Sequence, residues 1–394
     1  MRNANDNIPV LLVDDQEIIA SGLKQMLSNN PEFVLHYCQD PKEAIKTAEA
    51  LHPAVILQDL VMPEIDGLNL VKYFRALEST KDVPMIVLSS TDDAKIKAQA
   101  FDLGANDYLV KLPGKSELIA RLKYHSKSYY HLIERNEAFA QLNASRKALQ
   151  SELDEAAEYV RSQLPEPVKD QRIEANWRFI PSKELGGDSL GYHWLDENHL
   201  AIYLLDVCGH GVGPALLSCT INGLMRTDAL GNTDLKKPSD VLKELNARFQ
   251  MEQHHNMFFT LWYGVYSLAD KQLNYSSGGH PPAILSSHSK QHQELTTPGT
   301  VVGGMPDLEF SEGSVKIAPG DRLYLYSDGI YEIKNSETGK LLTIADFIAV
   351  VEKICGESPE LVESIDRILE FAKKTHGEET FPDDVSILGI RFLT

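Results

Sequence analysis

Residues 54–59 read Ala-Val-Ile-Leu-Gln-Asp, a short apolar run that ends in a carboxylate. The same pattern begins the chain at residues 10–13, where Val-Leu-Leu-Val is followed by Asp14 and Asp15. Short, unbroken apolar runs of this kind are typical of parallel strands that are covered on both faces. The sequence therefore predicts two buried strands with carboxylates at their carboxyl ends.

Two further apolar runs continue this pattern. Residues 85–88 lead into Ser89, and residues 108–110 lead into Lys111. Stretches with helical amphipathic spacing separate all four runs. This alternation predicts a doubly wound α/β sheet, whose site lies at the carboxyl edge of the strands.

In that topology five polar side chains converge on one pocket, namely Asp14, Asp15, Asp59, Ser89 and Lys111. Three clustered carboxylates repel one another unless a divalent cation neutralises them, and Mg²⁺ prefers such oxygen ligands. Lys111 can pair with the central carboxylate, and the Ser89 hydroxyl can donate to a phosphoryl oxygen. Asp59 is then the expected nucleophile. In the alternative interpretation, Asp14 and Asp15 only cap the helix that begins near Glu17.

Three motifs give residues 8 to about 125 a resemblance to the response-regulator receiver family. They are Val-Asp-Asp at 13–15, Gln-Asp-Leu-Val-Met-Pro-Glu-Ile-Asp-Gly at 58–67, and Gly-Ala-Asn-Asp-Tyr-Leu-Val-Lys at 104–111. The resemblance implies a flavodoxin-like domain over residues 1–125 in which a histidine kinase phosphorylates Asp59 and Ser89 and Tyr108 report the change. One departure is Lys111-Leu112-Pro113, because the family commonly has proline directly after the lysine.

The segment 115–164 contains no proline or glycine and is rich in helix-forming residues, so one helix of roughly 75 Å is expected. Two series of residues recur in steps of four and three, as in a coiled coil. They are Leu118, Leu122, His125, Tyr129, Leu132, Asn136 and Phe139, then Leu142, Arg146, Leu149, Leu153, Ala156 and Val160. We favour a homodimer that transmits a signal from the first domain; the alternative is a helix folded back onto its own domains.

Residues 165–394 change character to short β-rich runs with turn residues and two helical stretches, near 213–224 and 238–250, which predicts a layered α+β domain. Acidic residues stand beside glycines, or in a pair, in four places. These are Leu-Gly-Gly-Asp at 185–188, Asp-Val-Cys-Gly-His-Gly at 206–211, Ser-Asp-Gly at 327–329, and Pro-Asp-Asp-Val at 382–385. Carboxylates from separate strand ends can surround two hard cations, although a single Asp-Gly pair is more often a turn.

Together with Ser-Gly-Gly-His-Pro-Pro-Ala at 277–283, these segments resemble the SpoIIE-like branch of the PP2C phosphatases. The resemblance implies a domain over residues 165–394 with two Mn²⁺ or Mg²⁺ ions. It implies that Asp206 bridges the ions, that Asp188 and the Val207 carbonyl hold one, and that Asp328 and Asp383 hold the other, with Asp384 adjacent.

Two residues of the motif at 206–211 have open interpretations. Cys208 stands where the family usually has serine, a change that could make the site sensitive to oxidation. His210 either donates a proton to the leaving serine or only orients its loop.

The formal net charge of −19 disfavours nucleic acid and anionic membrane surfaces as partners, and no basic helical output domain for DNA is present. The four cysteines form no close pairs, and the first apolar run is too short for a signal peptide or a membrane span. We therefore expect a cytoplasmic protein.

The order receiver, helix, phosphatase resembles the RssB group of stress-response regulators, which act on sigma-factor pathways. For members with intact aspartates the resemblance implies a phosphatase that acts on a phosphoserine of a STAS-domain anti-sigma antagonist. Members without them are adaptors that deliver the stationary-phase sigma factor to the ClpXP protease. Since all the aspartate positions are kept here, we favour the enzyme and hold the adaptor as the alternative.

Overall fold

The computed structural model describes residues 7–63, 65–183, 185–227, 229–287 and 292–394, so Glu64 of the motif at 58–67 lies outside the described residues. The chain divides into two compact units, residues 1–147 and 148–394. The division falls inside the segment that was predicted to be a connecting helix. Each unit is described by itself below.

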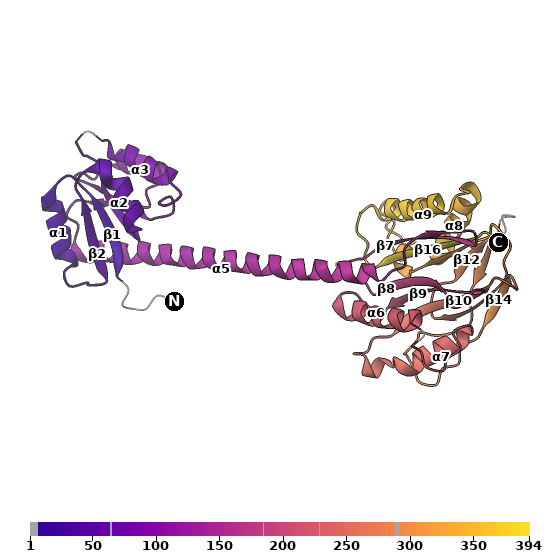
Figure 1. The fold of residues 1–394 in the computed structure, drawn as a ribbon. Coiled ribbons are helices and arrows are strands. Elements are labelled where there is room, and N and C mark those ends of the chain that lie inside the picture. The colour runs from indigo at the N-terminus through magenta and orange to yellow at the C-terminus, as the bar shows by residue number, and fades with distance from the viewer. Residues whose placement is uncertain (1–6, 64, 184, 228, 288–291) are drawn as a thin grey trace. The chain divides into compact units, whose positions relative to one another are not determined.

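The first unit is a five-stranded parallel sheet with helices on both faces (Figure 1). Its strands are β1 (Ile8–Val13), β2 (Phe33–Cys38), β3 (Val55–Asp59), β4 (Met85–Ser89) and β5 (Asp107–Val110), in the order β2-β1-β3-β4-β5. Its helices are α1 (Glu17–Leu27), η1 (Pro41–Glu43), α2 (Ala44–Leu51), α3 (Gly67–Ala76) and α4 (Ala94–Asp102). The predicted doubly wound fold is confirmed.

Four of these strands, β1, β3, β4 and β5, were predicted, whereas β2 was not. This strand lies at the edge of the sheet, beside β1, and four of its six residues are only half-buried. In its sequence, Phe-Val-Leu-His-Tyr-Cys, His36 interrupts the apolar run, and no carboxylate, serine or lysine follows directly after the run. The four polar strand ends thus belong to neighbouring strands in the sheet, although β2 separates two of them in the chain.

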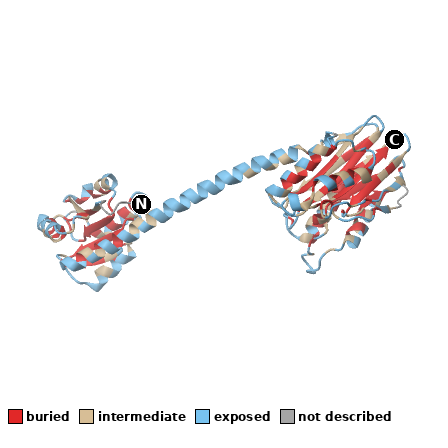
Figure 2. Cartoon of the chain, turned by 90° about the horizontal axis from the view of Figure 1, so that it is seen from below, coloured by how far each residue is buried: buried red, intermediate tan, exposed pale blue. Residues whose placement is uncertain are grey.

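The predicted long helix is present as α5 (Lys115–Ser162), with 48 residues. Its beginning packs against the first unit, where Leu118 and Leu122 are fully buried. Residues 134–152 are all exposed, as the pale colour along the middle of α5 in Figure 2 shows. None of the helices in the described ranges combines the length and the apolar character of a membrane span.

The second unit is a sandwich of two sheets in which all pairing is antiparallel. The first sheet consists of β8 (Asp188–Trp194), β9 (His199–Val207), β10 (Phe259–Ser267), β11 (Gln272–Gly278) and β14 (Gly313–Lys316), in the order β14-β11-β10-β9-β8. The second consists of β6 (Val168–Lys169), β7 (Ile173–Ile180), β12 (Ala283–Ser286), β13 (His292–Leu295), β15 (Arg322–Tyr326) and β16 (Val385–Phe392), in the order β13-β12-β15-β16-β7-β6.

Helices cover the outer faces of the sandwich (Figure 1). The first sheet carries α6 (Val212–Arg226) and α7 (Pro238–Arg248), with η2 (Met251–Gln253) after them; the second carries α8 (Ile344–Glu357) and α9 (Leu361–His376), with η3 (Asp328–Ile330) beside β16. This four-layer arrangement confirms the predicted α+β class.

The sequence analysis found α6 and α7 but missed α8 and α9. In α8 the many isoleucines and valines resemble a strand, yet Thr343 and Asp346 form a capping box that starts a helix. In α9 the buried positions Leu361, Ile365 and Ile368 recur with helical spacing, which is a signal that could have identified it.

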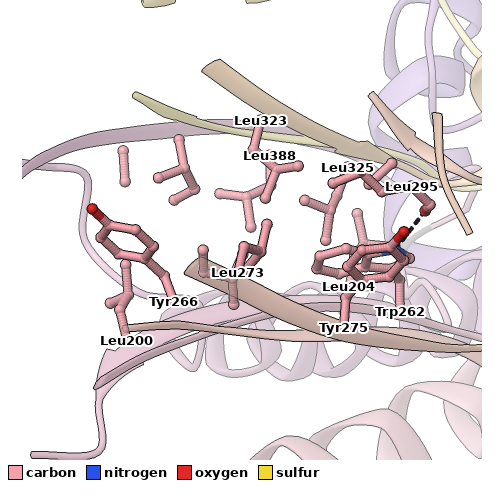
Figure 3. Packing of buried hydrophobic residues seen from close by; sticks show 14 of the residues in the cluster. Leu200, Leu204, Trp262, Tyr266, Leu273, Tyr275, Leu295, Leu323, Leu325 and Leu388 are labelled. Atoms are coloured by element: carbon pink, nitrogen blue, oxygen red, sulfur yellow. Dashed lines mark hydrogen bonds between the residues drawn. The ribbon is translucent and has the colours of Figure 1, made fainter. Parts of the chain in front are cut away.

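The core between the two sheets is built from alternate residues of their strands. Figure 3 shows Leu323, Leu325 and Leu388 of the second sheet facing the labelled residues of the first. The Trp262 indole donates to the Leu295 carbonyl oxygen at 2.9 Å, which satisfies its one polar atom. The packed sheets hold the strand ends in fixed positions.

We expect the substitution Leu388→Ala to lower the free energy of unfolding of the second unit by about 2–5 kcal/mol, because it leaves a cavity between the sheets. Leu341→Ala is the matched control, since Leu341 is 63% exposed, and should change it by less than about 0.5 kcal/mol. All three tryptophans lie in the second unit, so denaturant titration followed by tryptophan fluorescence reports on this unit. Equal stabilities of the two variants would contradict the assigned packing.

Candidate active site

A cluster of charged residues lies at the carboxyl edge of the parallel sheet, and we name Asp14, Asp15, Asp59 and Lys111 the receiver cluster. One carboxylate oxygen from each aspartate lies within 4.8 Å of the others. The Lys111 Nζ lies 2.8 Å from Asp59 Oδ2 and 3.1 Å from Asp14 Oδ2. The predicted convergence is therefore present in the structure.

The local sequence explains how Asp59 is held. A side chain at Gly67 would collide with the Asp59 carbonyl oxygen, so only glycine fits where α3 begins. The Gln58 side chain donates to the Gly67 carbonyl at 2.6 Å, and Asp66 caps α3 by accepting from the Leu68 amide at 2.9 Å. The motif at 58–67 thus closes a tight loop over the end of β3.

The charges of the receiver cluster act on one another in a partly buried site, because Asp14 and Asp59 are buried and Asp15 and Lys111 are half-buried. Burial and the neighbouring Asp59 charge raise the pKa of Asp14, against the hydrogen bonds that it accepts. Burial alone would lower the pKa of Lys111, but its hydrogen bonds to Asp59 and Asp14 raise it. One buried oxygen of Asp15, Oδ1, has no hydrogen-bond partner among the described residues, as expected for a position that a hard cation can occupy.

The other residues predicted for this site lie on the adjacent strands. Ser89 is buried at the end of β4, and its hydroxyl accepts from the Thr91 amide at 3.3 Å. The Tyr108 hydroxyl points inward and donates to the Thr91 carbonyl. At the departure from the family pattern, Leu112 adopts a left-handed backbone with φ of +55°.

A second cluster of carboxylates lies at one end of the sandwich, and we name Asp188, Asp206, Asp328, Asp383 and Asp384 the sandwich cluster. Asp188 and Asp206 are partners in register on β8 and β9. Because side chains alternate along a strand, they face the second sheet, as do Leu190 and Leu204 in the core. The first sheet thus contributes a pair of adjacent carboxylates.

The second sheet contributes the remaining three aspartates. Asp328 begins η3, with Ser327 between it and the end of β15, and Asp383 and Asp384 directly precede β16. Asp384 accepts from the Ser182 amide at 2.7 Å and from the Gly187 amide at 2.6 Å. Both of its oxygens therefore hold the loop that leads into Asp188.

That loop needs glycine because of this close approach. A Cβ at Gly186 would lie 2.6 Å from a carboxylate oxygen of Asp384. The Val207 carbonyl oxygen, a predicted metal ligand, lies against Gly187 at the end of β9. The Gly-Gly of 185–188 is thus the part of the motif that lets the backbone of one strand approach the others.

Burial and repulsion between neighbouring charges raise the pKa of Asp188, Asp206, Asp328 and Asp384. Burial and the charges of Asp328 and Asp383 raise the pKa of Asp206 to about 7. Burial, Glu332 and Asp383 raise the pKa of Asp328 to about 6. Burial, Asp206 and Asp384 raise the pKa of Asp188 well above the usual range.

The sandwich cluster has the features of a site for hard cations. Both carboxylate oxygens of Asp188 are buried and have no hydrogen-bond partner among the described residues. A buried carboxylate that lacks a donor is costly unless it is protonated or bound to a cation. The residues present therefore fit Mn²⁺ or Mg²⁺, which take oxygen ligands.

Two predicted residues of the motif at 206–211 take less central positions. His210 is exposed, on a loop whose flanking Gly209 and Gly211 have φ of +87° and +99°. The sulfur of Cys208 is half-buried and accepts from the Phe258 amide at 3.3 Å. The geometry gives His210 no contact with the described aspartates, so its acid role stays a prediction.

Sequence reasoning missed other polar residues around the sandwich cluster. Ser327 and Ser386 are fully buried, and the Ser386 amide donates to the Ser327 hydroxyl at 2.9 Å. Thr260 is the partner in register of Asp206 on β10, and His280 contacts Thr260. His280 belongs to the motif at 277–283, but the local sequence does not indicate which residues its side chain contacts.

Two family models match the chain. The response regulator receiver domain matches residues 10–123, and Stage II sporulation protein E (SpoIIE) matches residues 196–393. The molecule thus combines a receiver domain with a SpoIIE domain. Since the second match covers half of the chain, the chain belongs to the SpoIIE family.

Curated relatives and a solved structure agree with this architecture. The phosphoserine phosphatase RsbP of Bacillus subtilis is 30% identical over 182 residues, 46% of this chain and 45% of RsbP. The phosphoserine phosphatase RsbU of the same organism is 29% identical over 228 residues, 57% of this chain and 66% of RsbU. The chain thus spans less than two thirds of the length of each relative.

The SiaA-PP2C domain of Pseudomonas aeruginosa has a TM-score of 0.54 and 21% identity, covering 63% of this chain and 99% of that domain. This likeness shows the fold. The predicted resemblance of the chain to response-regulator receivers and to the SpoIIE family is confirmed.

We expect the metal-free second unit to lose stability as the pH rises from about 4 to about 7, relative to the variant Asp206→Asn. The folded unit holds its proton on Asp206 up to a pKa of about 7, whereas the unfolded chain releases it near its usual pKa of about 4. The folded state binds more protons in this window, so stability falls as pH rises.

The comparison with the variant is needed because the buried His280, whose pKa burial lowers to about 3, acts in the opposite direction. Denaturation midpoints, measured by tryptophan fluorescence in EDTA over this pH range, give the difference in stability between the wild type and Asp206→Asn. A difference between the two proteins that does not change with pH would refute the raised pKa of Asp206.

Proposed function

We propose that this chain is a two-component response regulator in which a histidine kinase phosphorylates Asp59. Phosphorylation controls a metal-dependent protein serine/threonine phosphatase formed by the sandwich cluster. The substrate is a phosphoserine on a protein, for which a STAS-domain anti-sigma antagonist is the proposed class. The observation that carries the proposal is the buried, donor-free carboxylate of Asp188 beside Asp206.

The proposed ligands divide between the two sheets. Asp188, Asp206 and the Val207 carbonyl come from the first sheet, and Asp328 and Asp383 come from the second. Asp384, whose oxygens both accept from backbone amides, holds the loop before Asp188 in place. Bound divalent cations would supply Lewis acidity that activates water and offsets charge on a phosphoryl group.

The receiver cluster suits phosphoryl transfer to Asp59. The Lys111 ammonium group donates to Asp59 Oδ2, and the Val61 amide donates to Asp59 Oδ1 at 3.2 Å. Asp14 and Asp15 would hold Mg²⁺, and the Ser89 hydroxyl would donate to a phosphoryl oxygen. The inward Tyr108 would respond to that change at Ser89 through Thr91, which both side chains contact.

The relatives support the enzyme over the adaptor. RsbP and RsbU are both named phosphoserine phosphatases, and this chain retains an aspartate at each of the predicted ligand positions. A chain that only delivered a sigma factor would have no need to keep Asp188 and Asp384 buried beside Asp206 and Asp328, where burial and mutual repulsion raise the pKa of these carboxyl groups.

The middle of α5 supports a homodimer. The side chains of Phe139, Leu142 and Leu149 are about two-thirds exposed and lie on the predicted seam. Burying such a stripe against a second copy in parallel would remove apolar surface from water. At the start of the predicted seam Leu118 and Leu122 are instead buried within the chain, and at its end Leu153 and Val160 are half-buried.

We expect Asp206→Ala and Asp328→Ala each to abolish Mn²⁺-dependent hydrolysis of a phosphate ester and of a phosphorylated STAS protein. Each removes a carboxylate that would offset charge on the cations. Asp240→Ala, on α7, is the matched control and should retain activity. Assays with and without a phosphoryl donor, compared with Asp59→Asn, show whether the receiver domain controls the rate.

If the wild-type chain is inactive on both substrates with Mn²⁺ and with Mg²⁺, the phosphatase proposal fails and sigma-factor binding becomes the function to test. If the rate is the same with and without the donor, the proposed control through Asp59 fails while the phosphatase stands.

We expect Leu142→Glu to dissociate the proposed dimer, because it places a charge on the apolar seam. Ala144→Glu is the control, since residue 144 lies on the opposite face by the heptad spacing. Light scattering coupled to gel filtration measures the mass of each variant, with and without phosphoryl donor. A monomeric wild type in both conditions argues against dimerisation through α5.

A further inference from the structure

His280 lies where the chain crosses from one sheet of the sandwich to the other. It stands between β11 of the first sheet and β12 of the second, and only 5% of its surface is exposed. The turn is fixed on both sides of the crossing. The Ser277 hydroxyl donates to the His280 carbonyl at 3.2 Å, and the Ser277 amide donates to the Thr297 hydroxyl at 2.8 Å. The imidazole is therefore held in one place inside the sandwich.

On the side of the first sheet, the ring contacts Thr260. The His280 Nδ1 lies 2.8 Å from the Thr260 Oγ1. Thr260 pairs in register with Asp206, and Asp206 pairs in register with Asp188. Partners in register on antiparallel strands place their side chains on the same face, about 5 Å apart. Asp188, Asp206 and Thr260 thus form a row across three strands, and His280 stands at its end.

On the side of the second sheet, Nε2 of the ring faces the backbone carbonyl of Tyr326, although the two atoms do not form a well-aligned hydrogen bond. Tyr326 is the last residue of β15, two residues before Asp328. The ring therefore lies between the strand next to Asp206 and the strand that leads into Asp328. These are the two halves of the sandwich cluster.

The imidazole is neutral in this position because burial lowers its pKa to about 3. A neutral ring carries one N–H and one acceptor nitrogen. Because Nε2 faces the Tyr326 carbonyl, the ring carries its proton on Nε2, and Nδ1 accepts from the Thr260 hydroxyl; this contact fixes the rotamer of Thr260 beside Asp206 in the row.

We propose that His280 is a positioning residue of the metal centre: by fixing Thr260 it holds the side chain that packs beside the Asp206 carboxylate, and its ring sets the spacing between the two sheets at the sandwich cluster. This inference rests on the proposed metal-dependent function. A residue that orients a ligating carboxylate contributes to metal affinity without touching the metal, and loss of such a contact costs about 10- to 100-fold in affinity. A histidine that only fills the core would contribute to stability alone.

The test is Mn²⁺ binding to the full chain, measured by isothermal titration calorimetry. We expect His280→Ala and Thr260→Val each to weaken Mn²⁺ binding about 10- to 100-fold. The double variant should be no weaker than the worse single variant, because both changes break one path. His280→Asn should retain affinity within about threefold, since its amide can replace the Nδ1 contact with Thr260.

His193→Gln is the matched control. It also replaces a histidine with a buried ring nitrogen, but His193 lies at the other end of β8 from Asp188. Its Mn²⁺ affinity should equal that of the wild type. Denaturation midpoints in EDTA, measured for every variant, separate a loss of fold from a loss of affinity.

Two outcomes would contradict different statements. If the wild type binds Mn²⁺ and both His280→Ala and Thr260→Val bind it within about twofold of the wild type, His280 only packs the core and the inference fails. If the wild type itself binds no Mn²⁺, the proposed metal-dependent function fails and the inference falls with it.

Discussion

Apolar packing between the two antiparallel sheets fixes the positions on which the second unit depends. The inter-sheet residues alternate with residues that face the covering helices, so both faces of each central strand are packed. A shift of one residue in any central strand would turn its leucines outward. Since Asp188 and Asp206 continue the inward series of Leu190 and Leu204, the same register that buries the core also sets the carboxylates side by side.

The clusters in the two units meet the same electrostatic constraint in different ways. In the receiver cluster the Lys111 ammonium group lies between the buried carboxylates of Asp14 and Asp59, and its positive charge offsets part of their negative charge. In the sandwich cluster the carboxylates meet mainly one another, and the pKa of Asp206 and of Asp328 rises. The first arrangement suits a site that must react, and the second suits one that must attract cations strongly.

Much of both sites could be predicted because their residues stand at the ends of recognisable strands or beside glycines. Asp59 follows an apolar run, and Asp206 and Asp328 do the same. The edge strand β2 and the helix α8 were not predicted. Half-burial in β2 and β-branched residues in α8 obscure the hydrophobic periodicity of these segments. The contacts of His280 with Thr260 and of Asp384 with Ser182 could not be predicted, since they join residues 20 and 202 positions apart through the tertiary fold.

The hydrogen bonds of Asp384 have a consequence for how the protein is made. The first long strand of the second unit, β7, pairs with the last, β16, and Asp384 at the start of β16 holds the loop that leads into Asp188. A ribosome releases the N-terminal segments first, so they must wait for the end of the chain before the sheet can close. A nascent or prematurely terminated chain can fold its first unit, yet it lacks the strand that completes the acidic site. Truncated products therefore contain the receiver domain without a complete sandwich cluster.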